Sequence, residues 1–262
     1  MRNLFGHIGR SFFIFLQDLS SLYSLFRETL TQSLILLLNR NKRKQARILE
    51  SVDEIGIRSL PLVLAVSALI GLALTVIISL QLKEVGGYGY IPGFVAVAIF
   101  REMAPLITAL IIAGRVGAAF TARIGTMKVS EEILALETMA INPVRYLVVQ
   151  RFIGLLFSLP ALTMLAGFTA MFGSFLFGSI RLGIPPDIYV RETLEVLSFA
   201  DIYTGMIKSL VFAVVISMIG CYCGLVIEGG AEDVGKATMT SVVSATLTVI
   251  VLDTVMTAAF YG

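Results

Sequence analysis

Four charged residues lie inside long apolar stretches, and they are the side chains of this sequence best placed to do chemistry. Arg101 and Glu102 are neighbours in one stretch, and Lys208 and Asp253 lie in two later stretches. If these stretches cross a membrane, a charge near the bilayer centre costs at least about 2.5–3.5 kcal/mol and needs a partner or a function. Two interpretations stay open: ion pairs that fix helix packing, or a polar site in a cavity.

Lys208 and Asp253 are predicted to meet. Lys208 opens its apolar stretch, and Asp253 lies deep in the next one, which runs in the opposite direction. At a helical rise of about 1.5 Å per residue, both side chains fall in the same half of the bilayer. The sequence predicts a salt bridge here, which could be purely structural or could line or gate an outward path.

Three apparent signs of catalysis are weak. His7 is the only histidine, which excludes histidine triads and multi-histidine metal sites. Cys221 and Cys223 form a C-x-C pair in an apolar stretch and are expected to be small buried residues. Gly230–Lys236 resembles a phosphate-binding loop but is followed by Ala237, where serine or threonine should hold magnesium. We therefore expect no cofactor in this chain.

The composition indicates a polytopic membrane protein. Of the 262 residues, 57% are hydrophobic and 15% are charged, and the mean hydropathy is +0.90. Soluble domains carry roughly 25% charged residues. This excludes a disordered chain, a nucleic-acid-binding protein and almost any soluble enzyme.

Five segments are long enough to span a bilayer as helices: 59–82, 85–123, 152–180, 209–227 and 237–262. Because five helices make a small bundle, we expect a homodimer.

The first 50 residues have a different character from residues 51–262. Their apolar stretches, 11–16 and 30–38, are too short to span, and basic residues follow the second. This pattern predicts amphipathic helices that lie in the membrane interface; a signal peptide is the alternative. Most lysines and arginines lie before the first span and between spans two and three, which predicts a cytoplasmic N-terminus and a C-terminus on the other side.

The segment between spans two and three predicts a short cytoplasmic helix. Ser130 is a suitable N-cap, the helix would run to about Ala140, and Asn142-Pro143 would start the next helix. Its surface would combine acidic and apolar side chains. The helix could simply rest on the bilayer, but an anionic leaflet repels acidic residues. Docking into a groove of a partner protein is the favoured interpretation.

The same segment resembles a signature of the MlaE/YrbE family, the permease subunits of ABC systems that move phospholipids with MCE proteins. The resemblance is carried by Gly125–Pro143, Arg101-Glu-Met-Ala-Pro105, Ala113–Ala118, Ile207–Phe212 and Asp253. It extends over roughly residues 50–262 in order. Leu134 departs from the pattern, since many members carry aspartate there, and the loop 83–92 is shorter than in some members.

The resemblance implies an all-α integral membrane protein that works as a dimer in an inner membrane. A separate cytoplasmic ATPase would bind ATP and magnesium and receive the short helix in a groove. An MCE-domain protein would sit on the opposite side, and a small cytoplasmic accessory subunit is possible. For the lipid pathway, the resemblance favours Glu102 and, less strongly, Arg101; the positions of three further residues in the sequence add Lys208, Asp253 and Tyr88 as candidates. Those implied for ATPase coupling are Glu131, Glu132, Ile133, Ala135, Leu136, Glu137 and Met139.

Two other functions stay open. An ion-coupled secondary transporter could use the four intramembrane charges as a relay, and a membrane scaffold would anchor partners without transport.

Further side chains predict packing and membrane anchoring. Gly220 and Gly224 are spaced for close helix approach. Four tyrosines are expected at the outer membrane boundary: Tyr88, Tyr90, Tyr189 and Tyr203.

Overall fold

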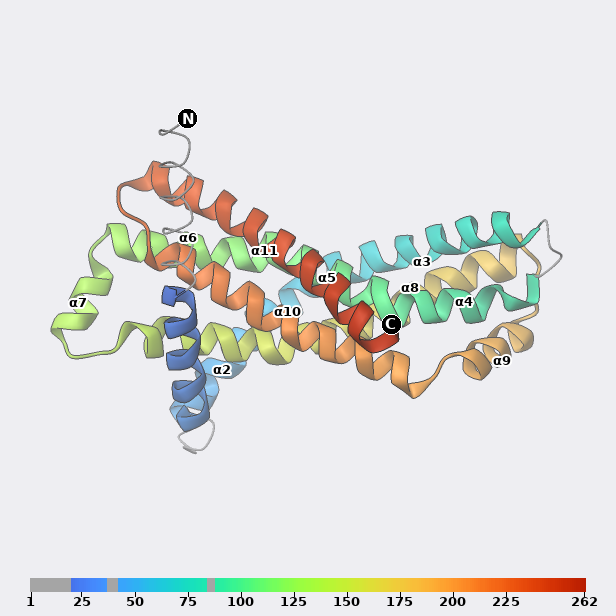
Figure 1. Ribbon diagram of the computed structural model, residues 1–262, viewed down its shortest axis with the longest axis horizontal. Coiled ribbons are helices and arrows are strands. Elements are labelled where there is room, and N and C mark those ends of the chain that lie inside the picture. The colour runs from blue at the N-terminus through green and yellow to red at the C-terminus, as the bar shows by residue number, and fades with distance from the viewer. Residues whose placement is uncertain (1–19, 37–41, 84–87) are drawn as a thin grey trace.

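The computed structural model shows an elongated bundle of helices (Figure 1). It describes residues 20–36, 42–83 and 88–262, with the side chains of 20–36, 49–82 and 89–262. All regular elements of these residues are helical, as predicted. Residues 11–16, predicted to form part of an interfacial helix, lie outside the described part, as do the basic side chains at 40–47.

Five helices are long and apolar enough to cross a membrane, which confirms the predicted number. They are Leu49–Leu82, Ile91–Val129, Val144–Arg181, Phe199–Leu225 and Ala231–Tyr261. The first joins α2 (Lys42–Ile55) to α3 (Leu60–Lys83), and the second joins α4 (Ile91–Ala98), α5 (Ala104–Ile112) and α6 (Ala118–Val129). The others contain α8 (Val149–Arg181), α10 (Phe199–Leu225) and α11 (Ala231–Tyr261). The second span extends six residues beyond the predicted end at Arg123.

Glycines allow α3 and α8 to pack backbone to backbone. A Cβ added at Gly71 would lie 1.8 Å from the carbonyl oxygen of Ala170, and one added at Gly173 would lie 2.1 Å from that of Ala68. Thr75 Oγ1 donates a 2.6 Å hydrogen bond to Ser174 Oγ at the same contact. Gly220 and Gly224 allow a similar close contact between α10 and α6. A Cβ at Gly220 would lie 3.1 Å from the carbonyl oxygen of Gly117, just before α6, and one at Gly224 would lie 3.0 Å from that of Thr121 in α6.

Gly71→Ala is expected to destabilise the bundle by about 1–3 kcal/mol, the usual cost of overpacking, because the new methyl group meets backbone that cannot rotate away. Thermal unfolding of the purified protein in detergent measures the effect. Gly235→Ala is the control, because a Cβ at this helical glycine meets nothing within 4 Å. Equal stability of the two variants would contradict the close α3–α8 contact.

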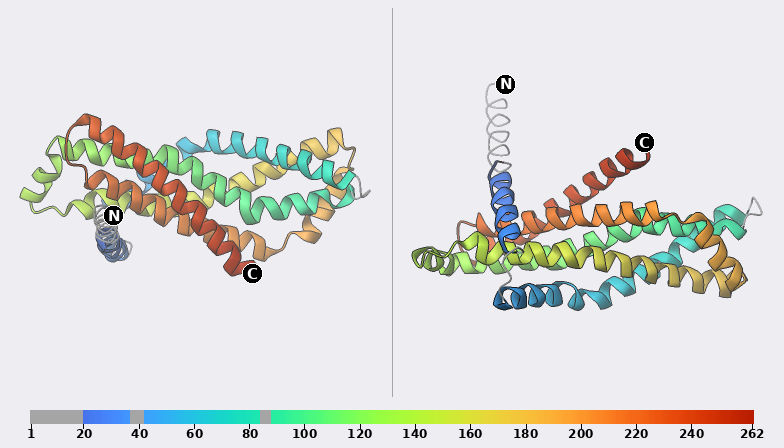
Figure 2. Two further views of the ribbon diagram at one scale, coloured as in Figure 1. Left: turned by 45° about the horizontal axis from the view of Figure 1, so that its top comes forward. Right: turned by 90° about the horizontal axis from the view of Figure 1, so that it is seen from below.

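The described N-terminal helical residues, 20–36, run crosswise to the bundle, as the right view of Figure 2 shows. Leu25 and Leu36 are buried in the main apolar core. Glu28 Oε1 accepts a 2.7 Å hydrogen bond from Asn142 Nδ2. A helix perpendicular to the spanning helices fits the predicted interfacial position.

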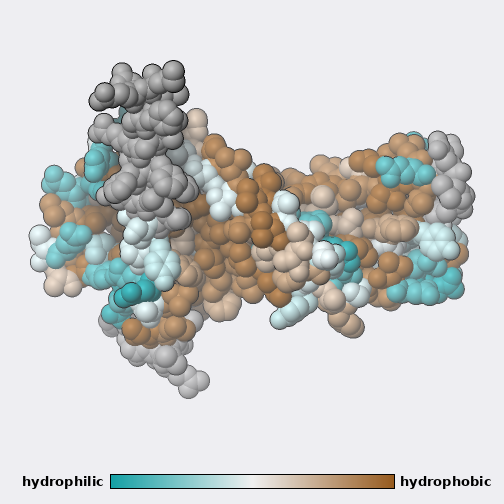
Figure 3. Space-filling view, in the orientation of Figure 1, coloured by the Kyte–Doolittle hydropathy of each residue, from teal (hydrophilic) through white to brown (hydrophobic). Residues whose placement is uncertain are grey.

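The two ends of the bundle are polar, and the surface between them is apolar (Figure 3). α7 (Glu132–Thr138) lies at one end and α9 (Pro186–Val196) at the other (Figure 1). Tyr90 and Tyr203 are exposed, as a membrane anchor must be, but Tyr189 on α9 is buried, which corrects its assignment as a boundary anchor. Its ring packs edge-on against Phe175, and its hydroxyl donates to Ser174 Oγ at 2.7 Å.

A charged cluster within the bundle

A π-helical turn, Ile99–Met103, carries Arg101 and Glu102 between α4 and α5. The amide of Ala104 bonds to the carbonyl of Ile99, five residues back. Pro105 follows and has no amide hydrogen, so the regular α-helical pattern cannot continue across it. On the facing helix, a Cβ at Gly205 would lie 2.3 Å from the Phe100 carbonyl oxygen. Glycine at 205 therefore lets α10 contact this turn directly.

Lys208 is the centre of one network. Its side chain is completely buried, and Nζ lies 2.7 Å from Glu102 Oε2 and 2.9 Å from Asp253 Oδ1. It also donates a 2.7 Å hydrogen bond to Thr257 Oγ1, and Thr257 in turn donates to Glu102 Oε1 at 2.8 Å. The contact with Asp253 is an ion pair without good hydrogen-bond direction, since Oδ1 has no hydrogen-bond partner. The predicted pairing of Lys208 with Asp253 is confirmed, with Glu102 as a second anion.

Arg101 is the centre of an adjoining network. Its Nε and Nη2 both contact Asp201 Oδ1, at 3.0 and 2.6 Å. Its Cζ lies 3.8 Å from the centroid of the Tyr261 ring, a cation–π contact. The other carboxylate oxygen of Asp201 accepts from the Ser198 amide at 3.1 Å and so caps the start of α10. Arg101 and Glu102 thus pair with the same helix through different partners.

Helical spacing explains why these side chains meet. Asp201, Thr204 and Lys208 follow one another at three and four residues on α10, and Asp253, Thr257 and Tyr261 at four residues on α11. Residues at such spacing share one helix face. Sequence reasoning missed four residues of the cluster: Asp201, Thr257, Tyr261 and Thr204, whose Oγ1 lies 2.7 Å from the Tyr261 hydroxyl. Two sequence signals could have found them: the capping pattern Ser198-x-x-Asp201 and the stripe on α11 that begins at Asp253.

The cluster is closed on one side and open on the other. Lys208 is inaccessible, whereas Glu102 keeps 25% and Arg101 33% of its side-chain surface. Figure 3 shows a small hydrophilic patch beside the C-terminal end of α11, surrounded by apolar surface. Three carboxylates face two cations, which leaves one formal negative charge if all are ionised. An unpaired charge is costly to bury, so the excess negative charge is best accommodated at the accessible side, where solvent or a bound cationic group can compensate it.

The remaining pathway residue, Tyr88, lies in a short 3-10 helix, Tyr88–Tyr90, before α4. Its side chain is outside the described part, so its predicted place on the lipid pathway stays a prediction. The residues that resemble a phosphate-binding loop form no loop: only Gly230 precedes the helix, and residues 231–236 are its first turns. Gly230 precedes α11, and Lys236 pairs with Glu232 within that helix at 2.8 Å.

The predicted cytoplasmic helix exists as α7 but begins later than expected. Ser130 does not cap it: this residue ends α6, and its hydroxyl donates to the Thr126 carbonyl at 2.9 Å. Glu131 takes the N-cap position with φ 61°, and Ala140 with φ 58° lies beyond the other end. α6 continues to Val129, so only seven residues remain for α7 between these two left-handed residues.

α7 presents most of its side chains outward. None of its residues is buried, and Leu134 and Met139 are 56% and 61% exposed. Ile133 and Leu136 are half-buried, and all other residues predicted for coupling are exposed: Glu131, Glu132, Ala135, Glu137 and Met139. Asn142 caps the next helix as predicted, since its Oδ1 accepts from the Arg145 amide at 3.1 Å.

Known proteins resemble this sequence over most of its length. The family described as Permease MlaE matches residues 48–259. A probable ABC transporter permease protein of Synechocystis is 35% identical over 85% of this chain and 84% of its own length. A Rickettsia conorii protein of the same description is 30% identical over 99% and 98%. The chloroplastic protein TRIGALACTOSYLDIACYLGLYCEROL 1 of Arabidopsis thaliana is 34% identical over 81% of this chain and 61% of its own length.

The matched residues include the first four apolar helices, α7, α11 up to residue 259, and the charged cluster except Tyr261. The chain belongs to the MlaE family of ABC transporter permeases and is a multi-pass membrane protein.

Proposed function

We propose that the chain is the permease subunit of an ABC transporter that moves phospholipids between the inner membrane and an MCE-domain protein. Two copies would form the transporter, with the N-terminus and α7 in the cytoplasm and the C-terminus on the periplasmic side. The chain itself performs no covalent chemistry. A separate ATPase subunit would bind ATP and magnesium and drive alternating closure of a cavity between the two copies.

The observation that carries this proposal is a charged cluster open on one side within an apolar surface. Phospholipids combine a charged headgroup with apolar chains, and this arrangement offers a surface to each. Arg101 and Glu102 keep part of their surface accessible, while Lys208, Asp253 and Asp201 are buried behind them. The second copy would enclose the open side. The plant relative is itself named after a diacylglycerol lipid, which agrees with a lipid substrate.

α7 supports an ATPase partner on the side where it lies. A short exposed helix with both acidic and apolar side chains suits a groove with basic and apolar walls. Its seven residues are held between two left-handed positions, so it is presented as a fixed projection. Movement of the ATPase would reach α6 and α8 through this projection, because α7 lies between them in the chain.

Replacing Glu131, Glu132 and Glu137 together by alanine is expected to abolish co-purification of the ATPase while leaving the bundle folded, since none of the three is buried. The measurement is purification from the native membrane in mild detergent, with bound proteins and lipids identified by mass spectrometry. The matched control replaces three acidic residues of α9, Asp187, Glu192 and Glu195, at the opposite end.

In wild type we expect an ATPase, an MCE-domain protein and phospholipid to co-purify. A stable dimer without any ATPase would overturn the ABC assignment of this chain and favour an ion-coupled transporter or a scaffold. Retention of the ATPase by the α7 variant would leave the permease assignment intact and show that α7 is not the docking element.

A further inference from the structure

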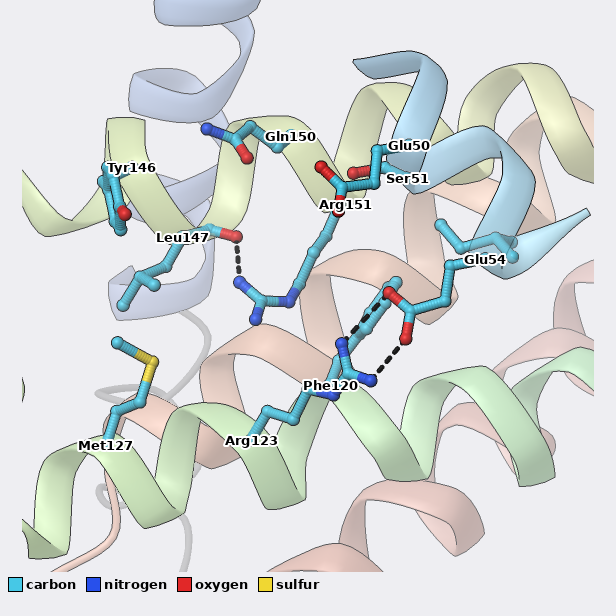
Figure 4. A pocket seen from close by; sticks show the side chains of 11 residues that line it. Glu50, Ser51, Glu54, Phe120, Arg123, Met127, Tyr146, Leu147, Gln150 and Arg151 are labelled. Atoms are coloured by element: carbon cyan, nitrogen blue, oxygen red, sulfur yellow. Dashed lines mark hydrogen bonds and ion pairs between the residues drawn. The ribbon is translucent and has the colours of Figure 1, made fainter. Parts of the chain in front are cut away.

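A cavity of about 400 Å³ lies at the α7 end of the bundle, between α2, α6 and α8 (Figure 4). A second cavity of about 240 Å³ adjoins it and shares Glu54, Ile55, Phe120 and Arg123 as walls. Neither contains a residue of the charged cluster described above. The arginines that line the two cavities are Arg58, Arg115, Arg123 and Arg151.

Positive charge exceeds negative charge in these cavities. Four guanidinium groups face two carboxylates, Glu50 and Glu54. Arg123 pairs with Glu54, with Nη1 at 3.0 Å from Oε2. Among the residues whose side chains the structure describes, no other carboxylate lies within 4.0 Å of these arginines. The cavities therefore hold cationic groups that lack ionic partners.

Two of these arginines are held by neutral acceptors. Arg115 donates through Nη1 to Ser59 Oγ, and Arg151 donates through Nη1 to the carbonyl of Leu147. A guanidinium group has five N–H donors, so each arginine has further donors to offer an anion. Figure 4 shows the guanidinium groups of Arg151 and Arg123 reaching from α8 and α6 into the space between these helices.

The same space has apolar walls. Ile55, Phe120 and Leu147 are buried, and Met127 lines the cavity beside them. Arg151 Cζ lies 5.8 Å from the centroid of the Phe120 ring. Guanidinium forks match the oxygens of phosphate, and apolar walls at the end of the spanning helices suit the glycerol and first methylenes of a lipid.

We propose that the two adjoining arginine-lined cavities together bind a phosphate ester group, and that the ester is the headgroup of an anionic phospholipid. The site is distinct from the charged cluster, and its occupancy requires neither transport nor an ATPase. Glu54 competes with the phosphate for Arg123.

The test measures binding to the purified full-length chain in a neutral detergent by thermal stabilisation and native mass spectrometry. The added probes are phosphatidylglycerol, phosphatidylcholine and glycerol 3-phosphate. We expect wild type to bind phosphatidylglycerol in preference to phosphatidylcholine. Arg115→Gln/Arg151→Gln should weaken this binding at least about tenfold, the equivalent of one lost charge-assisted hydrogen bond. Arg145→Gln is the control, since Arg145 is exposed and lines neither cavity.

Glu54→Gln tests the proposal in the opposite direction and does not depend on how the double variant folds. It releases Arg123 and should tighten phosphatidylglycerol binding. Equal binding of both lipids by wild type, or weaker binding by Glu54→Gln at unchanged stability, would overturn the proposal. Glycerol 3-phosphate that competes at the same concentration as the lipid would support the phosphate site and overturn the lipid as its source.

Discussion

Lys208→Met is expected to have the largest effect of any single substitution in the charged cluster. It removes a completely buried cation and leaves Glu102 and Asp253 facing each other without compensation. Removing one partner of a buried ion pair costs about 3–5 kcal/mol. We expect a lower unfolding temperature in detergent and loss of lipid transport after reconstitution with the partner ATPase.

Neutralising the whole network separates its structural role from its functional role. In Lys208→Met/Glu102→Gln/Asp253→Asn no charge remains unpaired, so stability should return toward that of wild type, whereas transport should stay absent. Glu102→Gln alone keeps one anion for Lys208 and should be stable but slow in transport. Wild-type transport by the triple variant would show that the network only fixes helix packing.

Several parts of the fold follow from sequence patterns that are local. Five apolar segments of sufficient length predict five spanning helices, because the bilayer sets the length and backbone hydrogen bonds must be satisfied within each helix. The Asn142-Pro143 cap is local as well, and the structure has it. Ser130 was misassigned because α6 continues to Val129, and the end of a helix depends on what it packs against. Here Lys128 Nζ donates to the carbonyl of Leu225 at the end of α10.

The charged cluster was predictable only in part. The positions of Lys208 and Asp253 along their helices predict the same depth in the membrane, and the two side chains do form an ion pair. Depth could not show that Glu102 would join Lys208, nor that Asp201 would pair with Arg101. Both pairs depend on how the second span and α10 are rotated about their axes, and the π-helical turn before Pro105 changes that rotation in the second span. Asp201 also gave no sign of an ion pair in the sequence, because it lies at the start of its helix, where the helix dipole alone favours an acidic residue.

Asp201→Ala is expected to be the second most damaging substitution, because Asp201 serves two structures at once. It pairs with Arg101 and caps the start of α10. Ser198→Ala removes the other half of the cap, in which Ser198 Oγ accepts from the Asp201 amide at 3.3 Å, and leaves the Arg101 pair in place; it should cost about 0.5–2 kcal/mol. Asp201→Ala should cost about 3 kcal/mol, the lower end for a buried ion pair, because Arg101 stays partly open to solvent.

A double-mutant cycle between Arg101→Gln and Asp201→Ala isolates the ion pair from the cap. Thermal unfolding of the four proteins should show that the double variant loses less stability than the sum of the single variants, because the second substitution no longer leaves a charge unpaired. Equal losses in Ser198→Ala and Asp201→Ala would assign the whole effect to the cap. The headgroup contact would then rest on Glu102, the other accessible residue of the cluster, since an Arg101 that contributes nothing to stability through Asp201 would not be fixed at the open side.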